Sequence, residues 1–233
     1  MILTRADGVL EAVTQSDHAH LAAELLSLWR GDGLPQNPRR PAILEATREH
    51  DNGWRESDSA PQVAPDTGEP YDFRTLPDDR RLELWHRGVE RATVGEPYAA
   101  ALIAHHAIEL HRERTEPEWL AALTRWGELR DELSEAAGVE PATRDRDYEL
   151  LRAADQLSLG LALRRVGEQP IGELRARFAD EELFLDPFPL AGATTFSLRH
   201  RRIDRRSYEN SIEFAVILSS SQWESRPIRV RPG

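Results

Sequence analysis

The sequence predicts a mainly α protein, a helical bundle with a small β-sheet beside it. Amphipathic segments with helical spacing recur between about residues 16 and 180, and several begin at Pro or end at Gly. Residues 1–14 differ, because two short apolar segments flank Asp7-Gly8 in the manner of a β-hairpin. Residues 194–231 contain alternating segments typical of strands. We therefore expect one domain over 1–233, in which the hairpin and the C-terminal strands form an accessory sheet.

The individual elements follow from local signals. Ser16 is the expected N-cap of the first helix. Helices are expected at 16–29, 41–51, 80–93, 97–114, 117–137 and 144–166. Strands are expected at 194–203 and 227–230, and a helix is favoured over a strand at 207–221. Residues 55–79 are irregular and contain four prolines, which fits either a substrate-contacting lid or a solvated insertion.

Composition excludes several functional classes. The net charge of −11 disfavours a nucleic-acid partner, which requires a basic surface. The chain has no Cys, and all of its 30 basic residues are Arg, so a thiol nucleophile, a Schiff-base lysine and a Walker lysine are excluded. Residues 1–10 are too polar for a signal peptide and no apolar run suits a membrane span, so we expect a cytoplasmic protein. A small-molecule substrate is the expected partner, and a homodimer is left open.

Several polar side chains fall on helix faces that are otherwise apolar. The helical period places His18 with Leu21 and Leu25 but turns His20 toward solvent. In the helix that begins at Pro97, His106 lies in the middle of the apolar stripe. His105 lies at the edge of that stripe, and His111 points away from it.

Two further segments supply inward carboxylates. His50 and Asp51 close the second helix, just before Gly53, and offer a nitrogen and an oxygen ligand from one short piece of backbone. Asp155 lies at the centre of an apolar stripe, where a carboxylate is costly unless it is paired or binds a cation. His86 borders its apolar face and is a weaker candidate. Together these residues predict a divalent metal site for one or two ions of Mn, Fe, Zn or Mg, with a buried polar network as the alternative.

The order His18, His50-Asp51 and Asp155 resembles the HD-domain superfamily of metal-dependent phosphohydrolases. That resemblance implies an HD-like helical bundle and a metal held by those four residues, with His86 and His106 available for a second ion. The chain is also similar along most of its length to an uncharacterised bacterial family of unknown function. Segments 15–18, 50–54, 99–106 and 155–158 carry this second similarity.

The resemblance implies hydrolysis of a small phosphorylated substrate. Asp51 would both bind the metal and steer the attacking water, and His106 would stabilise the leaving group or bind a second ion. Arg48 or Arg55, which flank the His-Asp pair, would bind phosphate oxygens. Two alternatives remain: a di-iron oxygenase like myo-inositol oxygenase, which needs all six ligands including His86, and a non-catalytic binding or interaction module.

Overall fold

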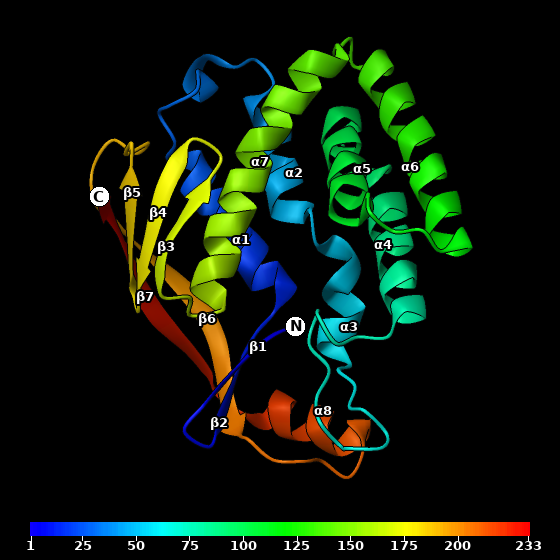
Figure 1. The fold of residues 1–233 in the computed structure, drawn as a ribbon, viewed down its shortest axis with the longest axis vertical. Coiled ribbons are helices and arrows are strands. Elements are labelled where there is room, and N and C mark those ends of the chain that lie inside the picture. Colours follow the sequence, from blue (N-terminus) through cyan, green and yellow to red (C-terminus); the bar gives the residue numbers. More distant parts are fainter.

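The computed structural model describes residues 1–233 and shows an α/β fold. Helices contain 50% of the residues, and a curled, mixed sheet of seven strands contains 22%. The prediction of a mainly α, HD-like bundle is therefore wrong. Its error lies in the sheet, which is a full layer of the molecule rather than a small accessory (Figure 1).

The sheet has the strand order β1-β2-β6-β7-β5-β4-β3. All neighbouring strands are antiparallel except β5 and β7, which are parallel. The strands are β1 (Ile2–Ala6), β2 (Val9–Val13), β3 (Gly167–Ile171), β4 (Leu174–Ala179), β5 (Glu182–Asp186), β6 (Thr194–Asp204) and β7 (Trp223–Pro232). The last strand thus lies inside the sheet, between β6 and β5.

Strands β3, β4 and β5 replace the end of the expected helical body. In β4 the buried residues Leu174, Ala176 and Phe178 alternate with exposed arginines, which is the two-residue period of a strand. Gly172 and Asp180, both with positive φ (57° and 53°), allow the tight turns on either side of this strand. The expectation that helices extend to about residue 180 is wrong here, because this two-residue alternation forms strands.

The N-terminal hairpin and the C-terminal elements match the sequence prediction more closely. Asp7 and Gly8 form the hairpin turn with φ of 47° and 75°. Helix α8 (Ser211–Ser220) confirms the preference for a helix in this segment, and Asn210 caps it by accepting the N–H groups of Ile212 and Glu213. Strand β7 is longer than the expected 227–230.

The remaining helices form the other layers. They are α1 (Gln15–Ser27), α2 (Arg40–Glu49), α3 (Arg55–Ser59), α4 (Asp78–Ala92), α5 (Pro97–His111), α6 (Pro117–Ala136) and α7 (Pro141–Ala162), with short 3₁₀ turns η1 (Leu34–Gln36) and η2 (Asn52–Trp54). Proline occupies the first position of α5, α6 and α7, where its missing N–H has no partner in any helix. The cap of α1 is Thr14 rather than Ser16, since the Thr14 hydroxyl accepts the Asp17 N–H at 2.9 Å.

Helices α1 and α7 lie against one face of the sheet, and α2, α5, α4 and α6 follow on the side away from it (Figure 1). The main apolar core joins these layers, because it contains Leu25 of α1, Leu157 of α7 and Ile228 of β7. A Cβ at Gly160 would lie 2.5 Å from the ring of Phe178, so glycine lets α7 approach β4 closely.

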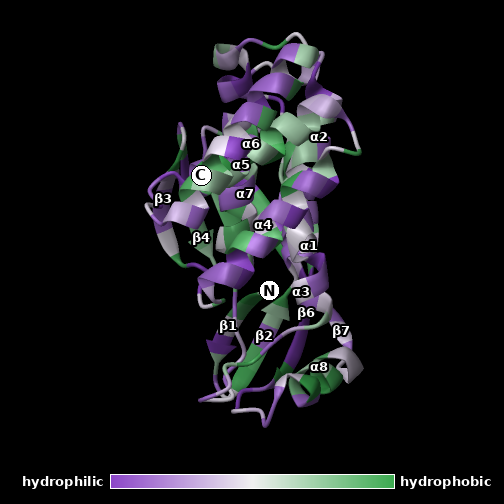
Figure 2. Ribbon diagram, turned by 90° about the vertical axis from the view of Figure 1, so that its right-hand side faces the viewer, coloured by the Kyte–Doolittle hydropathy of each residue, from purple (hydrophilic) through white to green (hydrophobic).

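Helix α8 lies apart from this stack, at the lower end of the molecule, and is largely apolar (Figure 2). Its Phe214 and Leu218 pack in a smaller apolar cluster with residues of β1, β2 and β6. No helix combines the length and the apolar character that crossing a bilayer requires. The expectation of a single domain over 1–233 stays a prediction.

Candidate metal centre

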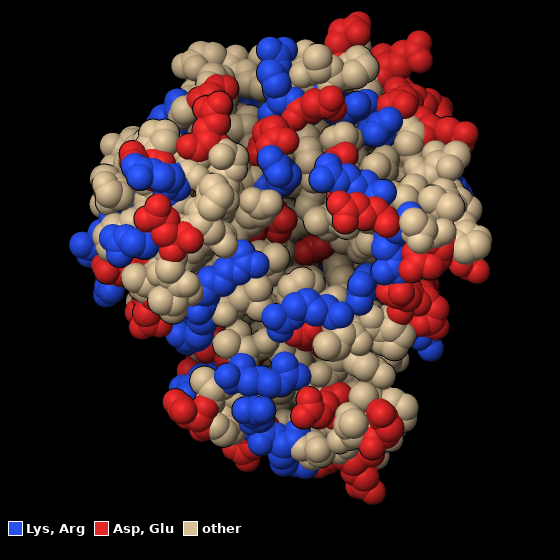
Figure 3. Space-filling model, in the orientation of Figure 1, with Lys and Arg blue, Asp and Glu red and all other residues tan.

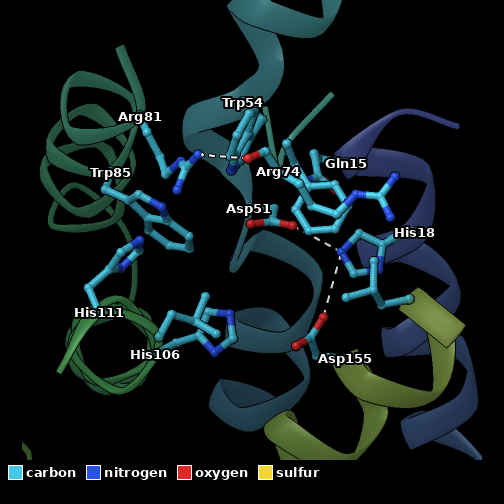
Figure 4. Close-up of a pocket in the computed structure, with 13 residues that line it drawn as sticks. Gln15, His18, Asp51, Trp54, Arg74, Arg81, Trp85, His106, His111 and Asp155 are labelled. Atoms are coloured by element: carbon cyan, nitrogen blue, oxygen red, sulfur yellow. Dashed lines mark hydrogen bonds and ion pairs between the residues drawn. The ribbon is translucent and has the colours of Figure 1, made fainter. Parts of the chain in front are cut away.

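A cavity of about 370 Å³ lies among α1, α4, α5 and α7. Two of its lining residues are acidic, Asp51 and Asp155, and two are basic, Arg74 and Arg81. Figure 3 shows the hollow, with acidic atoms at its depth and basic side chains around its mouth. Figure 4 shows the lining residues converging from different elements.

The five inward-facing polar residues expected from the sequence meet at the depth of this cavity, where four of them line it and His50 lies buried behind them. They come from α1, the end of α2, α5 and α7, and all are buried: His18, His50, Asp51, His106 and Asp155. The ring centroid of His50 lies 5.1 Å from the ring centroid of His18 and 4.9 Å from that of His106. The choice of His18 over the exposed His20 is therefore consistent with the structure, as is the choice of His106 over His105, which packs edge-on against Tyr148 instead.

Hydrogen bonds fix the orientation of two of these imidazoles. His50 Nδ1 lies 2.7 Å from the carbonyl oxygen of Thr47, which can only accept, so this nitrogen carries a proton. His18 Nδ1 lies 2.8 Å from Ser158 Oγ, whose own proton is donated to the carbonyl of Asp155. His18 Nδ1 is therefore also a donor. Both rings turn Nε2 toward the carboxylates, which is the arrangement of histidine ligands held by outer hydrogen bonds.

Each of these two Nε2 atoms lies close to both carboxylates. His18 Nε2 is 2.9 Å from Asp51 Oδ2 and 3.7 Å from Asp155 Oδ1. His50 Nε2 is 3.5 Å and 3.4 Å from the same two oxygens and has no hydrogen-bond partner. Three of the four separations exceed the usual hydrogen-bond range of about 2.7–3.2 Å. Ligands at about 2.0–2.2 Å from one shared ion lie about 3.0–3.5 Å apart, so most of these separations suit ligands that share an ion. His18, His50 and Asp51 form one group whose ligand atoms all lie within 4.8 Å of one another.

The electrostatics of the cluster follow from burial and opposite charge. Burial opposes the charged form of His50, but Asp51 and Asp155 outweigh it and raise the pKa of His50 to about 9. Burial likewise opposes ionisation of Asp155 and Asp51, yet the neighbouring imidazoles hold the pKa of both carboxyls below its usual range. Burial, reinforced by the charge of His50, lowers the pKa of His106 to about 4. His106 is therefore neutral at pH 7 and able to act as a ligand.

His106 belongs to a second potential ligand group. Ligand atoms of His50, His106 and Asp155 lie within 4.8 Å of one another, as do those of His18, His50 and Asp51. His106 Nδ1 also lies 3.2 Å from the hydroxyl of Tyr148. Two adjoining ligand groups share His50, which leaves both one-ion and two-ion occupancy open.

Three residues predicted for the site lie elsewhere. His86 is half-buried on another side of α4, where its ring packs edge-on against Trp126 at 5.2 Å. Arg48 is exposed on α2, and Arg55 is exposed and paired with Glu49. These arginines flank the His-Asp pair in sequence, but the helical turn directs their side chains away from it.

Other lining residues were missed by sequence reasoning. Arg74 comes from the irregular segment 55–79 and Arg81 from the start of α4; aromatic side chains of Trp54, Phe73, Trp85 and His111 form much of the wall. The fold brings residues 73 and 74 of the expected loop to the pocket, as a substrate-contacting loop requires.

His111 does not point to solvent, because α6 covers the far side of α5 and Trp119 stacks on its ring at 4.3 Å. The signal for this was available, since α5 is apolar on all sides and such helices are buried.

Comparisons with known proteins place the chain in a family without assigning an activity. No curated protein and no solved structure matches the chain. Nothing in the comparisons supports the HD-domain superfamily, whereas the expected similarity to an uncharacterised family is confirmed. Residues 1–205 match the model described as "Protein of unknown function (DUF3891)", and the chain therefore belongs to the DUF3891 family.

Proposed function

We propose that the protein is a metal-dependent hydrolase that acts on a small phosphorylated substrate. His18, His50 and Asp51 would hold one divalent ion, and His106 would complete a second position with His50 and Asp155. Asp155 would also face the first ion, because its Oδ1 lies 3.7 Å from His18 Nε2. Bound there, such an ion lowers the pKa of water and polarises a phosphoryl oxygen. The observation that carries the proposal is the position of His50 Nε2, which is buried, lacks a hydrogen-bond partner and faces two carboxylates at ligand-like separations.

The arginines of the pocket support an anionic substrate. Buried Asp72 fixes the backbone and the guanidinium of Arg74, whose Nε donates to it at 3.0 Å. Arg81 is tethered through Nη2 to the carbonyl oxygens of Arg74 and Leu76, at 3.1 Å and 2.9 Å. Arg74 is thus oriented through its Nε and Nη2 atoms, and Arg81 through Nη2. Arg74 and Arg81 therefore take the phosphate-binding role that the sequence suggested for Arg48 and Arg55.

The carboxylates and imidazoles of the chain would handle protons and water. Asp51 can orient a water molecule because its other oxygen pairs with His18. Neutral His106, at the border of the cavity, can accept or pass a proton during departure of the leaving group. A relationship of this chain to the HD superfamily is also part of the proposal, and its only support is the order of His18, His50-Asp51 and Asp155 along the sequence. A cytoplasmic location and a homodimer are also retained as proposals.

The test begins with metal content. Protein stripped by a chelator and reloaded with Mn²⁺, Fe²⁺, Zn²⁺ or Mg²⁺ is analysed for bound metal and assayed with phosphomonoesters, phosphodiesters and nucleotides. We expect one or two ions per chain and metal-dependent hydrolysis. Asp155→Asn keeps the size of the side chain but removes its charge, so metal affinity is expected to fall at least about 100-fold. Asp145→Asn, on the exposed side of the same helix, is the matched control.

The alternative is a non-catalytic module in which the cluster is a buried polar network. In that case no metal binds stoichiometrically under any loading condition, and Asp155→Asn changes only the stability of the fold. The six-ligand di-iron oxygenase has no support from the geometry, because His86 lies away from the cluster and packs on Trp126. Absence of bound metal after reloading would eliminate the hydrolase proposal.

A further inference from the structure

A second cavity opens onto the same centre from another side. It has a volume of about 450 Å³ and lies between α5, α7 and β3, an edge strand of the sheet. Four residues border both cavities: His106, Leu110, Asp155 and Leu159. The two cavities are therefore branches of one depression that meet at the proposed ligands. A single phosphate bound beneath Arg74 and Arg81 leaves the second branch unused.

The second branch is basic in an otherwise acidic protein. Three arginines line it, Arg112 at the end of α5, Arg152 on α7 and Arg165 after α7, together with the amides of Gln156 and Gln169. Its acidic residues are Glu109 and Asp155, and Asp155 is already assigned to the metal. The chain as a whole carries a net charge of −11. This local reversal of charge favours an anionic ligand.

The guanidinium groups of this branch are available for a ligand. Arg112 and Arg152 make only one-turn ion pairs with Glu109 and Glu149, and such exposed pairs are weak. Arg165 bonds the amide oxygen of Gln169 at 3.2 Å and has no acidic partner. Tyr148, which hydrogen-bonds His106 Nδ1, places a hydroxyl group where this branch meets the metal ligands.

We propose that this branch binds a second anionic group of the substrate, so that the enzyme acts on molecules carrying phosphates at two ends. The inference rests on the proposed function and narrows its substrate class. One phosphoryl group lies at the His and Asp cluster beneath Arg74 and Arg81. The rest of the molecule passes Leu110 and Leu159, and its second phosphate lies among Arg112, Arg152 and Arg165.

Equilibrium binding of non-hydrolysable probes tests the idea. Mn²⁺-loaded protein is titrated by calorimetry with alkylphosphonates of four to eight carbons and with the matching α,ω-bisphosphonates. We expect the best bisphosphonate to bind about tenfold or more tightly than its monophosphonate, because charge-assisted contacts to two arginines are added. In the double variant Arg152→Ala/Arg165→Ala this preference should fall to about twofold or less. Arg146→Ala, on α7 but outside both branches, should retain the preference.

The outcomes separate the two proposals. Equal affinity of mono- and bisphosphonates, with phosphomonoester hydrolysis present, overturns only the second binding branch. A preference that survives removal of both arginines also overturns it, because the second phosphonate then binds elsewhere. A bisphosphonate preference that depends on Arg152 and Arg165, without any hydrolysis, supports the branch and contradicts the proposed reaction. If no phosphonate binds and no hydrolysis is observed, both the proposed hydrolase function and the proposed second binding branch are overturned.

Discussion

The histidines around the cavity divide into two groups by charge. His50 faces two carboxylates, which raise its pKa to about 9 against the opposing effect of burial. His106 and His111 have no such pairing, and burial lowers the pKa of each to about 4. His111 donates Nδ1–H to the carbonyl oxygen of Ala107 and stacks on Trp119, and its burial there outweighs that hydrogen bond and favours the neutral ring. The pocket therefore contains imidazoles that burial holds neutral beside one that two carboxylates hold charged.

This difference predicts an acid-sensitive fold. Below pH 6.5 an unfolded His111 binds a proton, whereas the folded one does so only near pH 4, so stability falls as the pH drops through this window. His111 contributes up to about 3 kcal/mol to that loss. His111→Phe keeps the stacking surface and removes the titration, so the free energy of unfolding should depend less on pH between 6.5 and 4. Urea unfolding at several pH values measures this slope.

His20 provides the control for that measurement. It is exposed on α1, so His20→Gln should leave the slope unchanged. An unchanged slope in His111→Phe would show that His111 is not held neutral by the fold.

Residue-scale sequence reasoning reached the cluster but not the whole pocket. Helical periodicity identified His18, His106 and Asp155 because each ligand lies on a regular helix whose inward face is readable. Arg74 could not be found in this way. It lies in an irregular segment without periodicity, and its position depends on a contact between Asp72 and its own guanidinium.

At the scale of elements, the contact between η2 and α4 determines where the His50-Asp51 pair lies. Gly53 and Gly88 face one another, and a Cβ on Gly53 would collide with the carbonyl oxygen of Leu84 and reach 3.0 Å from Gly88 N. Both neighbouring atoms belong to the α4 backbone, which cannot move as a flexible side chain can. The Gly in Asp51-Asn52-Gly53-Trp54 therefore allows the chain to pass α4 directly after the His50-Asp51 pair.

Gly53→Ala should consequently push η2 away from α4 and displace Asp51. We expect a loss of about 1–3 kcal/mol in unfolding free energy, typical of overpacking at a rigid contact, and weaker metal binding. Gly127→Ala is the matched control, because its Cβ meets nothing within 4 Å and alanine favours a helix. Chemical denaturation and metal titration of both variants measure the effect. Native metal affinity in Gly53→Ala would contradict the role given to this contact.

Prediction of elements was accurate where one local signal acted alone. The hairpin turn at Asp7-Gly8 and the helices that begin at Pro97 and Pro117 follow from residues within a few positions. The segment β3–β5 is harder to predict, although β4 alternates, because its three strands are short and follow directly after the long helix α7. Its parallel pairing with β7 joins residues more than forty positions apart and is set by packing rather than by local sequence.

At the scale of the molecule, the sheet and the helices share one core. β7 joins the β1-β2-β6 part of the sheet to the β5-β4-β3 part, and its buried Ile228 belongs to the same apolar cluster as Leu157 of α7 and Tyr98 of α5. A buried ion pair strengthens the connection, because Arg226 of β7 donates to the carbonyl oxygen of Leu161 and lies 3.5 Å from Glu11 of β2. Asp155 lies on the same helix, two turns before Leu161. The His and Asp cluster is thus supported by the sheet, although no strand supplies one of its residues.

This arrangement predicts that the chain unfolds as one unit, despite a length at which independent domains are common. Ile228→Ala removes buried volume from the sheet and should cost about 2–5 kcal/mol of unfolding free energy. If the core is shared, the helices lose stability equally, so far-UV circular dichroism and tryptophan fluorescence should shift by the same amount and remain coincident. Trp85, Trp119 and Trp126 lie in the separate cluster of α4, α5 and α6. In a background in which the other three tryptophans, Trp29, Trp54 and Trp223, are replaced by Phe, their fluorescence reports at a distance from the substitution. A fluorescence transition that stays at its original midpoint while the rest unfolds earlier would instead divide the chain into two independently folding parts.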